Sequence, residues 1–177
     1  GNHNAATAII EKNKTYIKNS GATLLVTSCP ICYKTFKEDY QLDIQVMHHT
    51  EYINLLIQEK VLQPRQSELK TVFHNPCELG RGCGVYAAPE EILKTVSRKL
   101  TTAYDGKKSL CCGGSLANSY LTNIQRTQLS QDTLNAYLTY KPDILVTACP
   151  LCKKTLSKSD SQVPVKDIAE VVAQAIG

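Results

Sequence analysis

The chain has 177 residues, of which 42% are hydrophobic and 20% are charged, so it can bury a core and is not a disordered tail. Its formal net charge is only +4 and its Lys and Arg residues are scattered, which argues against a nucleic-acid-binding surface. No apolar run approaches the roughly 18 residues of a membrane span, and the first ten residues do not resemble a secretory signal. We therefore expect a cytoplasmic protein, and any attachment to the inner face of a membrane would go through partner subunits.

The first third of the sequence alternates between helix and strand patterns. Ala5–Asn19 predicts a helix, and an apolar run beginning at Thr23 ends in a Cys-Pro-x-Cys turn at residues 29–32. Such a run, followed by a helix that starts with proline, is typical of a buried parallel strand and its following helix. A second short strand is predicted over Ile44–Met47, and Thr50 precedes the next amphipathic helix.

The alternation continues after a polar stretch, Val61–Lys70, which we take as the boundary between two lobes. A predicted strand over Lys70–His74 leads into Asn75–Ala88, which we expect to be an irregular loop. A helix beginning at Pro89 is predicted to keep apolar side chains on one face as far as Leu100.

The last third repeats the pattern of the first. A short strand candidate at Ser109–Leu110 precedes a predicted helix over Asn118–Tyr140 and a second Cys-Pro-x-Cys turn at residues 149–152. A strand over Val163–Val165 follows, and Asp167 precedes the final amphipathic helix.

These two parts of the chain are copies of one unit. TLLVTSCPICYKTF (residues 23–36) matches DILVTACPLCKKTL (residues 143–156) at a constant offset of 120 positions. The sequence therefore predicts an α/β fold of two pseudo-repeated Rossmann-like lobes with mostly parallel sheets. Residues 1–65 would be the C-terminal part of a first repeat and residues 66–177 a complete second one. The same offset places the equivalents of Cys77, Cys111 and Cys112 before Gly1, so we expect the first lobe to be incomplete.

Eight cysteines give the sequence its clearest chemical signal. Three separate segments place cysteines just after predicted strands, and ligands of α/β sheets gather at the carboxyl ends of parallel strands. We therefore predict that five thiols share one edge of the second sheet: Cys77, Cys111, Cys112, Cys149 and Cys152.

Five thiols in this arrangement favour a polynuclear iron–sulfur centre. Adjacent cysteines cannot easily chelate one small ion, but they can contact two different irons of a cluster. A structural zinc site usually pairs two Cys-x-x-Cys turns, which would leave Cys111 and Cys112 unused. Zinc and disulfides stay open as alternatives, and Cys149 with Cys152 would also suit a thioredoxin-like dithiol protein.

The order Cys77, then Cys111-Cys112-Gly113, then Cys149-x-x-Cys152 resembles the cysteine-rich CCG domain. FHNPCELGRGCGVYAAPEEIL resembles the segment with the family's first cysteine, and CPICYKTF followed by HHTEYI resembles the end of a preceding copy. The family includes the B-type polypeptide of heterodisulfide reductase and the C-terminal half of its D-type polypeptide. It also includes iron–sulfur subunits of glycolate oxidase and anaerobic glycerol-3-phosphate dehydrogenase. The resemblance covers essentially the whole chain, which would be truncated at its N-terminus.

The resemblance implies a 4Fe–4S centre, noncubane in heterodisulfide reductase, held by all five cysteines. It implies an oxidoreductase, either the catalytic subunit or an electron-transfer part of a larger complex. Electrons would come from a ferredoxin-like or flavin-containing subunit and pass to a disulfide or a quinone-linked acceptor. Two alternatives remain at this stage: a zinc-stabilised docking module and the thioredoxin-like dithiol protein.

Four further residues lie close to these motifs in the sequence. By the resemblance, Cys29 and Cys32 are remnants of a first metal site, which would bind nothing, take zinc or pair with each other here. Cys83 has no place in the family pattern and is interpreted as a free thiol. His74 is interpreted as a core or loop-capping histidine, with a hydrogen bond to the cluster as the alternative.

Overall fold

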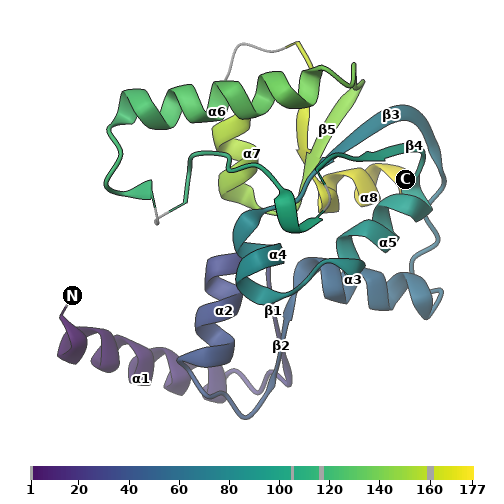
Figure 1. Cartoon of the computed structure of the whole chain (residues 1–177). Helices are drawn as coiled ribbons and strands as arrows, with labels where there is room; N and C mark the ends of the chain where they lie inside the picture. Colours follow the sequence, from purple (N-terminus) through teal and green to yellow (C-terminus); the bar gives the residue numbers. More distant parts are fainter. Residues whose placement is uncertain (1, 105, 116–117, 159–161) are drawn as a thin grey trace.

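The computed structural model describes residues 2–104, 106–115, 118–158 and 162–177, in which helices and strands alternate (Figure 1). The elements in chain order are α1 (His3–Asn19), β1 (Leu24–Thr27), α2 (Pro30–Glu38), β2 (Gln45–His48), α3 (His49–Gln58), β3 (Ser67–His74), α4 (Cys77–Cys83), α5 (Ala87–Val96), β4 (Ser97–Thr102), the short 3₁₀ helix η1 (Gly106–Lys108), α6 (Asn123–Leu138), β5 (Ile144–Thr147), α7 (Pro150–Leu156), β6 (Val165–Asp167) and α8 (Ile168–Ile176).

The strands form two sheets, and every strand pair in them is parallel. The larger sheet has the order β4-β3-β5-β6, and β1 pairs with β2 in a separate two-stranded sheet. In the larger sheet β3 lies between β4 and β5, with Val72 opposite Leu145. This arrangement confirms the predicted α/β fold with parallel sheets.

The four-stranded sheet is buried on both faces. Along β5, Leu145 joins a core beneath α6 and α7, whereas Ile144 and Val146 join a second core beneath α5 and α8. Successive strand residues point to opposite faces of a sheet, so an uninterrupted apolar strand is what a doubly covered sheet requires.

Helix α3 joins the first part of the chain to the core of the second. Ile53 and Ile57 pack against the cluster that contains the buried side chains of α5 and α8. Asn54 Nδ2 donates to Glu91 Oε2 at 2.6 Å on the rim of this contact. The helix that follows the two-stranded sheet therefore packs on a core of the four-stranded sheet.

Helix α1 runs away from the rest of the molecule (Figure 1). None of its residues is buried, and Ile9 and Tyr16 are 59% and 62% exposed. Asn13 Nδ2 donates to Tyr40 Oη at 2.8 Å, which ties the middle of this helix to the segment after α2.

The predicted loop over residues 75–88 is wrong, because it contains α4. Pro76 provides an extended N-cap, and Gly84, with φ of 73°, ends the helix in the left-handed conformation. The sequence did not predict this helix because it contains Gly80 and Gly82, and glycine is unfavourable inside a helix. The packing favours glycine at position 80, because a Cβ on this residue would lie 2.7 Å from Tyr86 Cε1.

The helix predicted from Pro89 also ends earlier than expected. Ser97 is extended, and Leu100 lies in strand β4, which has no counterpart in the sequence prediction. The strand candidate at Ser109–Leu110 is not a strand. Cys111 and Cys112 therefore do not come directly after a strand, because the preceding strand, β4, ends at Thr102.

Two other boundaries moved. Helix α6 begins at Asn123 rather than at residue 118, because Thr122 caps it and Gln125 completes the capping box. Residues 116 and 117, next to that predicted start, lie outside the described ranges. His48, rather than Thr50, caps α3.

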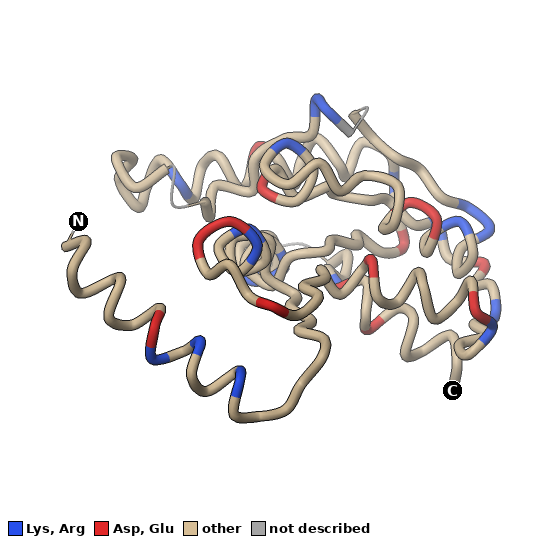
Figure 2. The backbone as a smooth tube through the Cα atoms, turned by 90° about the horizontal axis from the view of Figure 1, so that it is seen from below, with Lys and Arg blue, Asp and Glu red and all other residues tan. Residues whose placement is uncertain are grey.

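Charges of both signs are interspersed along the described chain (Figure 2). Within the described residues, no helix combines the length and apolar character that crossing a bilayer requires.

Candidate functional site

Three parallel strands end near a shared group of thiols. Strands β1, β3 and β5 end at Thr27, His74 and Thr147, and a cysteine follows each end within three residues. One cavity is lined by the side chains that these ends deliver, together with Cys112 and its neighbour Ser115: Cys29, Ile31, Pro76, Cys77, Glu78, Cys112, Ser115, Cys149, Leu151 and Cys152. Four of the five predicted thiols line it, and the fifth, Cys111, hydrogen-bonds with Cys77.

The Cys-Pro-x-Cys turn places two sulfurs at the start of α7. Cys149 is the extended N-cap residue, with φ of −154° and ψ of 123°, and Pro150 occupies the first helical position. A hydrogen bond from Cys152 and the backbone N–H groups of Cys152 and Leu151 lower the pKa of the Cys149 thiol. Exposed N–H groups at a helix N-terminus favour thiolate in this way.

The adjacent cysteines sit in a turn that is built around glycine. Cys111 Sγ accepts hydrogen bonds from Gly113 N at 3.4 Å and from Asn118 Nδ2 at 3.2 Å. Gly113 has φ of 81°, and a Cβ on it would lie 2.6 Å from the carbonyl oxygen of Arg126. Only glycine fits this position, since both the dihedral angle and the neighbouring helix exclude a side chain.

Hydrogen bonds link the five thiols into two groups, a pair and a set of three. Hydrogen bonds from Cys77, Gly113 and Asn118 lower the pKa of Cys111 to about 6, while the pKa of Cys77 is raised by that same bond and by burial. On the other side, hydrogen bonds from Cys152, His74 and the Gly114 backbone lower the pKa of Cys112 to about 5. Donation to Cys112 and Cys149 raises the pKa of Cys152. These hydrogen bonds therefore favour the thiolate forms of Cys111 and Cys112.

His74 lies behind these sulfurs and is completely buried at the end of β3. Its Nδ1 lies 3.0 Å from Tyr137 Oη. One of its ring nitrogens and the sulfurs of Cys112 and Cys152 all lie within 4.8 Å of one another. Sequence reasoning missed Tyr137, because nothing in its pattern separates it from the other apolar residues of α6.

A loop anchor that sequence reasoning also missed leads to the adjacent cysteines. Arg81, on α4, donates through Nη1 to Ser109 O at 2.8 Å and to Ser109 Oγ at 3.0 Å. Arg81 thus fastens the segment just before Cys111 to the helix that begins at Cys77.

The remaining cysteines occupy three different positions. Cys29 lines the same cavity as Cys149 and Cys152. Cys32 is an exposed residue, and partial burial of its thiol together with the nearby Cys29 raises its pKa. Cys83 does not line this cavity, and its thiol lies 3.6 Å from Pro30 O. The structure thus brings Cys29 to the predicted five and leaves Cys83 beside α2.

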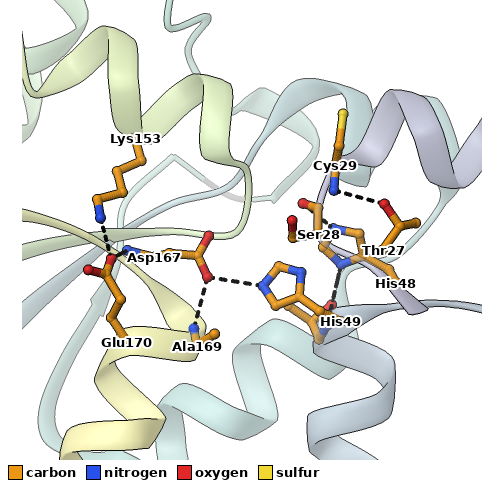
Figure 3. A network of polar contacts seen from close by, with 10 residues as sticks. Thr27, Ser28, Cys29, His48, His49, Lys153, Asp167, Ala169 and Glu170 are labelled. Carbon is orange, nitrogen blue, oxygen red and sulfur yellow. Dashed lines mark hydrogen bonds and ion pairs between the residues drawn. The ribbon is translucent and has the colours of Figure 1, made fainter.

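A network of polar side chains joins the two sequence copies beside this cavity (Figure 3). His48 Nε2 lies 3.1 Å from Ser28 O, and His49 Nε2 lies 3.2 Å from Asp167 Oδ1. Glu170 accepts from Asp167 N at 2.7 Å and from Lys153 Nζ at 2.6 Å. His48 ends β2 and His49 follows it, and among the described residues neither histidine joins the cysteines in a group that could hold a metal.

The donor set fits a metal centre made of thiolates. Glu78 is the carboxylate at the cavity, and its Oε1 accepts from Ser115 Oγ at 2.8 Å. Soft thiolate ligands select iron–sulfur clusters or zinc rather than hard cations. The cavity itself measures about 20 Å³, and the thiols around it hydrogen-bond with one another, so a cluster requires these side chains to rotate apart.

Comparison with known proteins bears on the whole chain. The profile of the CCG family, described as "Cysteine-rich domain", matches residues 1–37 and 71–157. The chain is 29% identical to the D-type polypeptide of the dihydromethanophenazine:CoB--CoM heterodisulfide reductase of Methanosarcina acetivorans, over 99% of this chain and 46% of that one. It is 26% identical to the "Probable iron-sulfur-binding oxidoreductase FadF" of Bacillus subtilis, over 99% of this chain and 27% of that one. A solved structure, a putative Asp/Glu racemase from Yersinia pestis, covers 98% of this chain and 73% of its own, with 11% identity and a TM-score of 0.45.

The chain spans less than half of the length of these two curated relatives. The two matched segments contain all five thiols of the predicted centre, and the first of them contains Cys29 and Cys32. They cover well over half of the chain, which therefore belongs to the CCG family of cysteine-rich domains.

Proposed function

We propose that this chain is an iron–sulfur redox module of an oxidoreductase of the heterodisulfide reductase type. The proposed ligands of its 4Fe–4S centre are Cys77, Cys111, Cys112, Cys149 and Cys152. The observation that carries the proposal is the convergence of these five thiols from three remote segments, where neighbouring donors lower the pKa of Cys111 and Cys112. Bound iron and sulfide would supply one-electron chemistry, which thiols alone do not offer.

The residues of the chain would hold and tune such a centre. Backbone N–H groups of Gly113 and Gly114 donate to the sulfurs of Cys111 and Cys112, which stabilises thiolate without any counter-charge. Leu151 and Ile31 line the cavity and limit contact with water. Cys77 and Cys152 hold the protons that they would release on metal binding, so affinity for the cluster should rise with pH.

The wider assignment follows from the relatives. We propose that the electrons come from a ferredoxin-like or flavin-containing partner, and that a disulfide or a quinone-linked compound accepts them. We further propose a division near residue 65, with the second repeat holding the complete centre. Cys29 and Cys32 would be ligands of a first site, placed beside the second one.

Anaerobic reconstitution with iron and sulfide tests the proposal. We expect about four irons per chain in the wild type and a paramagnetic signal after reduction or oxidation. Cys112→Ala should lose the cluster or change its spectrum, whereas Cys83→Ala, which changes a thiol outside the cavity, should keep both. A protein that takes up no iron in this experiment would contradict the proposal, as would a Cys112→Ala variant with unchanged iron content and spectrum.

Zinc is a second candidate, and a specific observation favours it. His74, Cys112 and Cys152 offer three ligand atoms within 4.8 Å of one another, and Cys149 hydrogen-bonds with Cys152. Such a Cys₃His set suits tetrahedral zinc in a structural or docking module. Tight binding of one zinc ion per chain, without uptake of iron, would favour this function over the first.

A further inference from the structure

A buried histidine and tyrosine stand behind the thiols, and the proposed electron transfer assigns no role to either. His74 ends β3 and Tyr137 lies on α6, and both side chains have 0% exposure. Their rings meet edge to face, with centroids 5.4 Å apart. Burying a polar group this deeply is unfavourable unless the group is hydrogen-bonded. The hydrogen-bond partners of each polar atom therefore indicate where its hydrogen lies.

The surroundings of Tyr137 decide where the hydrogen of this pair lies. The backbone N–H of Leu110 donates to the tyrosine oxygen, which counteracts part of the rise in pKa that burial causes at Tyr137. The hydroxyl hydrogen is then left to donate, and His74 Nδ1, 3.0 Å from Oη, is the acceptor that this geometry provides. In the neutral ring Nδ1 therefore carries no hydrogen, and Nε2 carries it.

The other ring nitrogen is the group that remains for the thiols. Within the described part of the chain, His74 Nε2 is buried and makes no hydrogen bond of standard length and angle. The sulfurs of Cys112 and Cys152 lie within 4.8 Å of a nitrogen of this ring. Cys112 is also the thiol whose pKa a His74 hydrogen bond helps to lower.

We propose that His74 is a positioning residue, held by Tyr137 as the Nε2–H tautomer so that it donates its hydrogen to the sulfur of Cys112. The proposal rests on the proposed function, because the bond acts on redox chemistry only when Cys112 is a ligand of the cluster. A hydrogen bond to a ligand sulfur stabilises the electron-rich reduced cluster and so raises the reduction potential. Burial keeps this bond free from competition with water.

The first test needs no cluster. Long-range ¹H–¹⁵N correlation spectra of the reduced, metal-free protein report which ring nitrogen of His74 carries hydrogen. We expect Nε2–H in the wild type, and a Tyr137→Phe variant should weaken this preference by removing the donor to Nδ1. A hydrogen on Nδ1 in the wild type would overturn the proposal, since the Nε2 lone pair would then be available to a metal. This result stands even if the protein takes up no iron and the proposed function fails.

The second test measures the reduction potential of the reconstituted protein. His74→Leu removes the donor, whereas His74→Gln can place an N–H group near the former Nε2. We expect the potential of His74→Leu to fall below that of the wild type and His74→Gln to lie between them, with iron content preserved. An unchanged potential in His74→Leu would show a packing role only and would overturn the proposal. If His74→Leu does not fold, an unchanged potential in both His74→Gln and Tyr137→Phe would overturn it equally.

Discussion

At the scale of single residues, the pKa of a thiol in this protein depends on its hydrogen-bond donors as well as on its burial. Cys111 is half-buried, yet neighbouring donors hold it as thiolate, whereas Cys83 is half-buried with a pKa that burial raises. The thiolate is the nucleophilic form of cysteine, so this difference has a direct chemical consequence.

Alkylation of the metal-free, reduced protein should reveal that difference. At pH 7 we expect iodoacetamide to modify Cys111 at least about tenfold faster than Cys83, because Cys111 is already ionised. Peptide mass spectrometry after timed quenching measures both rates in one sample. Raising the pH should narrow the ratio, because a larger fraction of Cys83 then ionises. Equal rates at pH 7 would refute the assigned protonation states.

A second residue-scale prediction concerns His48 and pH. Burial, and then the nearby His49, lowers the pKa of His48 to about 3, whereas the unfolded chain takes up a proton near its ordinary value. Stability from this residue is therefore present above about pH 6.5 and lost as pH falls toward 3. We expect it to account for about 2 kcal/mol of the decrease in unfolding free energy between pH 7 and pH 5.

Denaturant titrations of the metal-free protein at several pH values check this. His48→Asn keeps a good N-cap for α3 but removes the titrating ring. The variant should show a smaller decrease in unfolding free energy between pH 7 and pH 5 than the wild type. Parallel pH profiles for the two proteins would contradict the assignment.

At the scale of elements, the glycine turn after the adjacent cysteines is the most constrained segment of the site. Gly113 and Gly84 both have positive φ, but a Cβ at Gly113 would meet a backbone atom of α6, whereas nothing lies within 4 Å at Gly84. We expect Gly113→Ala to destabilise the protein by about 2–3 kcal/mol and Gly84→Ala by about 1 kcal/mol. Denaturant unfolding of both variants measures the difference, and equal losses would mean that the α6 contact imposes no cost.

The elements also show what the sequence could and could not reveal. The turn at Cys149 was predictable, because an apolar run, a proline and a matching copy at Cys29 all pointed to a strand followed by a helix. Helix α4 was not, since the packing that requires Gly80 is visible only when Tyr86 is in place. Likewise the five thiols were identified from their spacing. The role of Tyr137, in contrast, depends on a contact between residues 63 positions apart.

At the scale of the whole molecule, the polar network beside the cavity connects the two sequence copies (Figure 3). His49 follows β2 in one copy, and Asp167 ends β6 in the other. Their side chains are 9% and 15% exposed and lie 3.2 Å apart, so this contact is shielded from solvent. Such shielding strengthens an interaction between a histidine and a carboxylate.

A double-mutant cycle measures that connection. We expect His49→Leu and Asp167→Asn to be coupled by about 1–2 kcal/mol in unfolding free energy, since the Asn variant keeps a capping side chain for α8. Thermal or urea unfolding of the two single variants and the double variant gives the coupling. A sum of single effects equal to the double effect would mean that the contact between His49 and Asp167 does not help to hold the two copies together.

The solvent-facing position of α1 has a dynamic consequence. None of its residues is buried, so only the hydrogen bonds of the helix itself protect its amide hydrogens. In contrast, every residue of β5 is buried. In hydrogen–deuterium exchange, α1 should therefore exchange by local fraying within seconds to minutes. The β5 amides should exchange only when the whole sheet opens cooperatively.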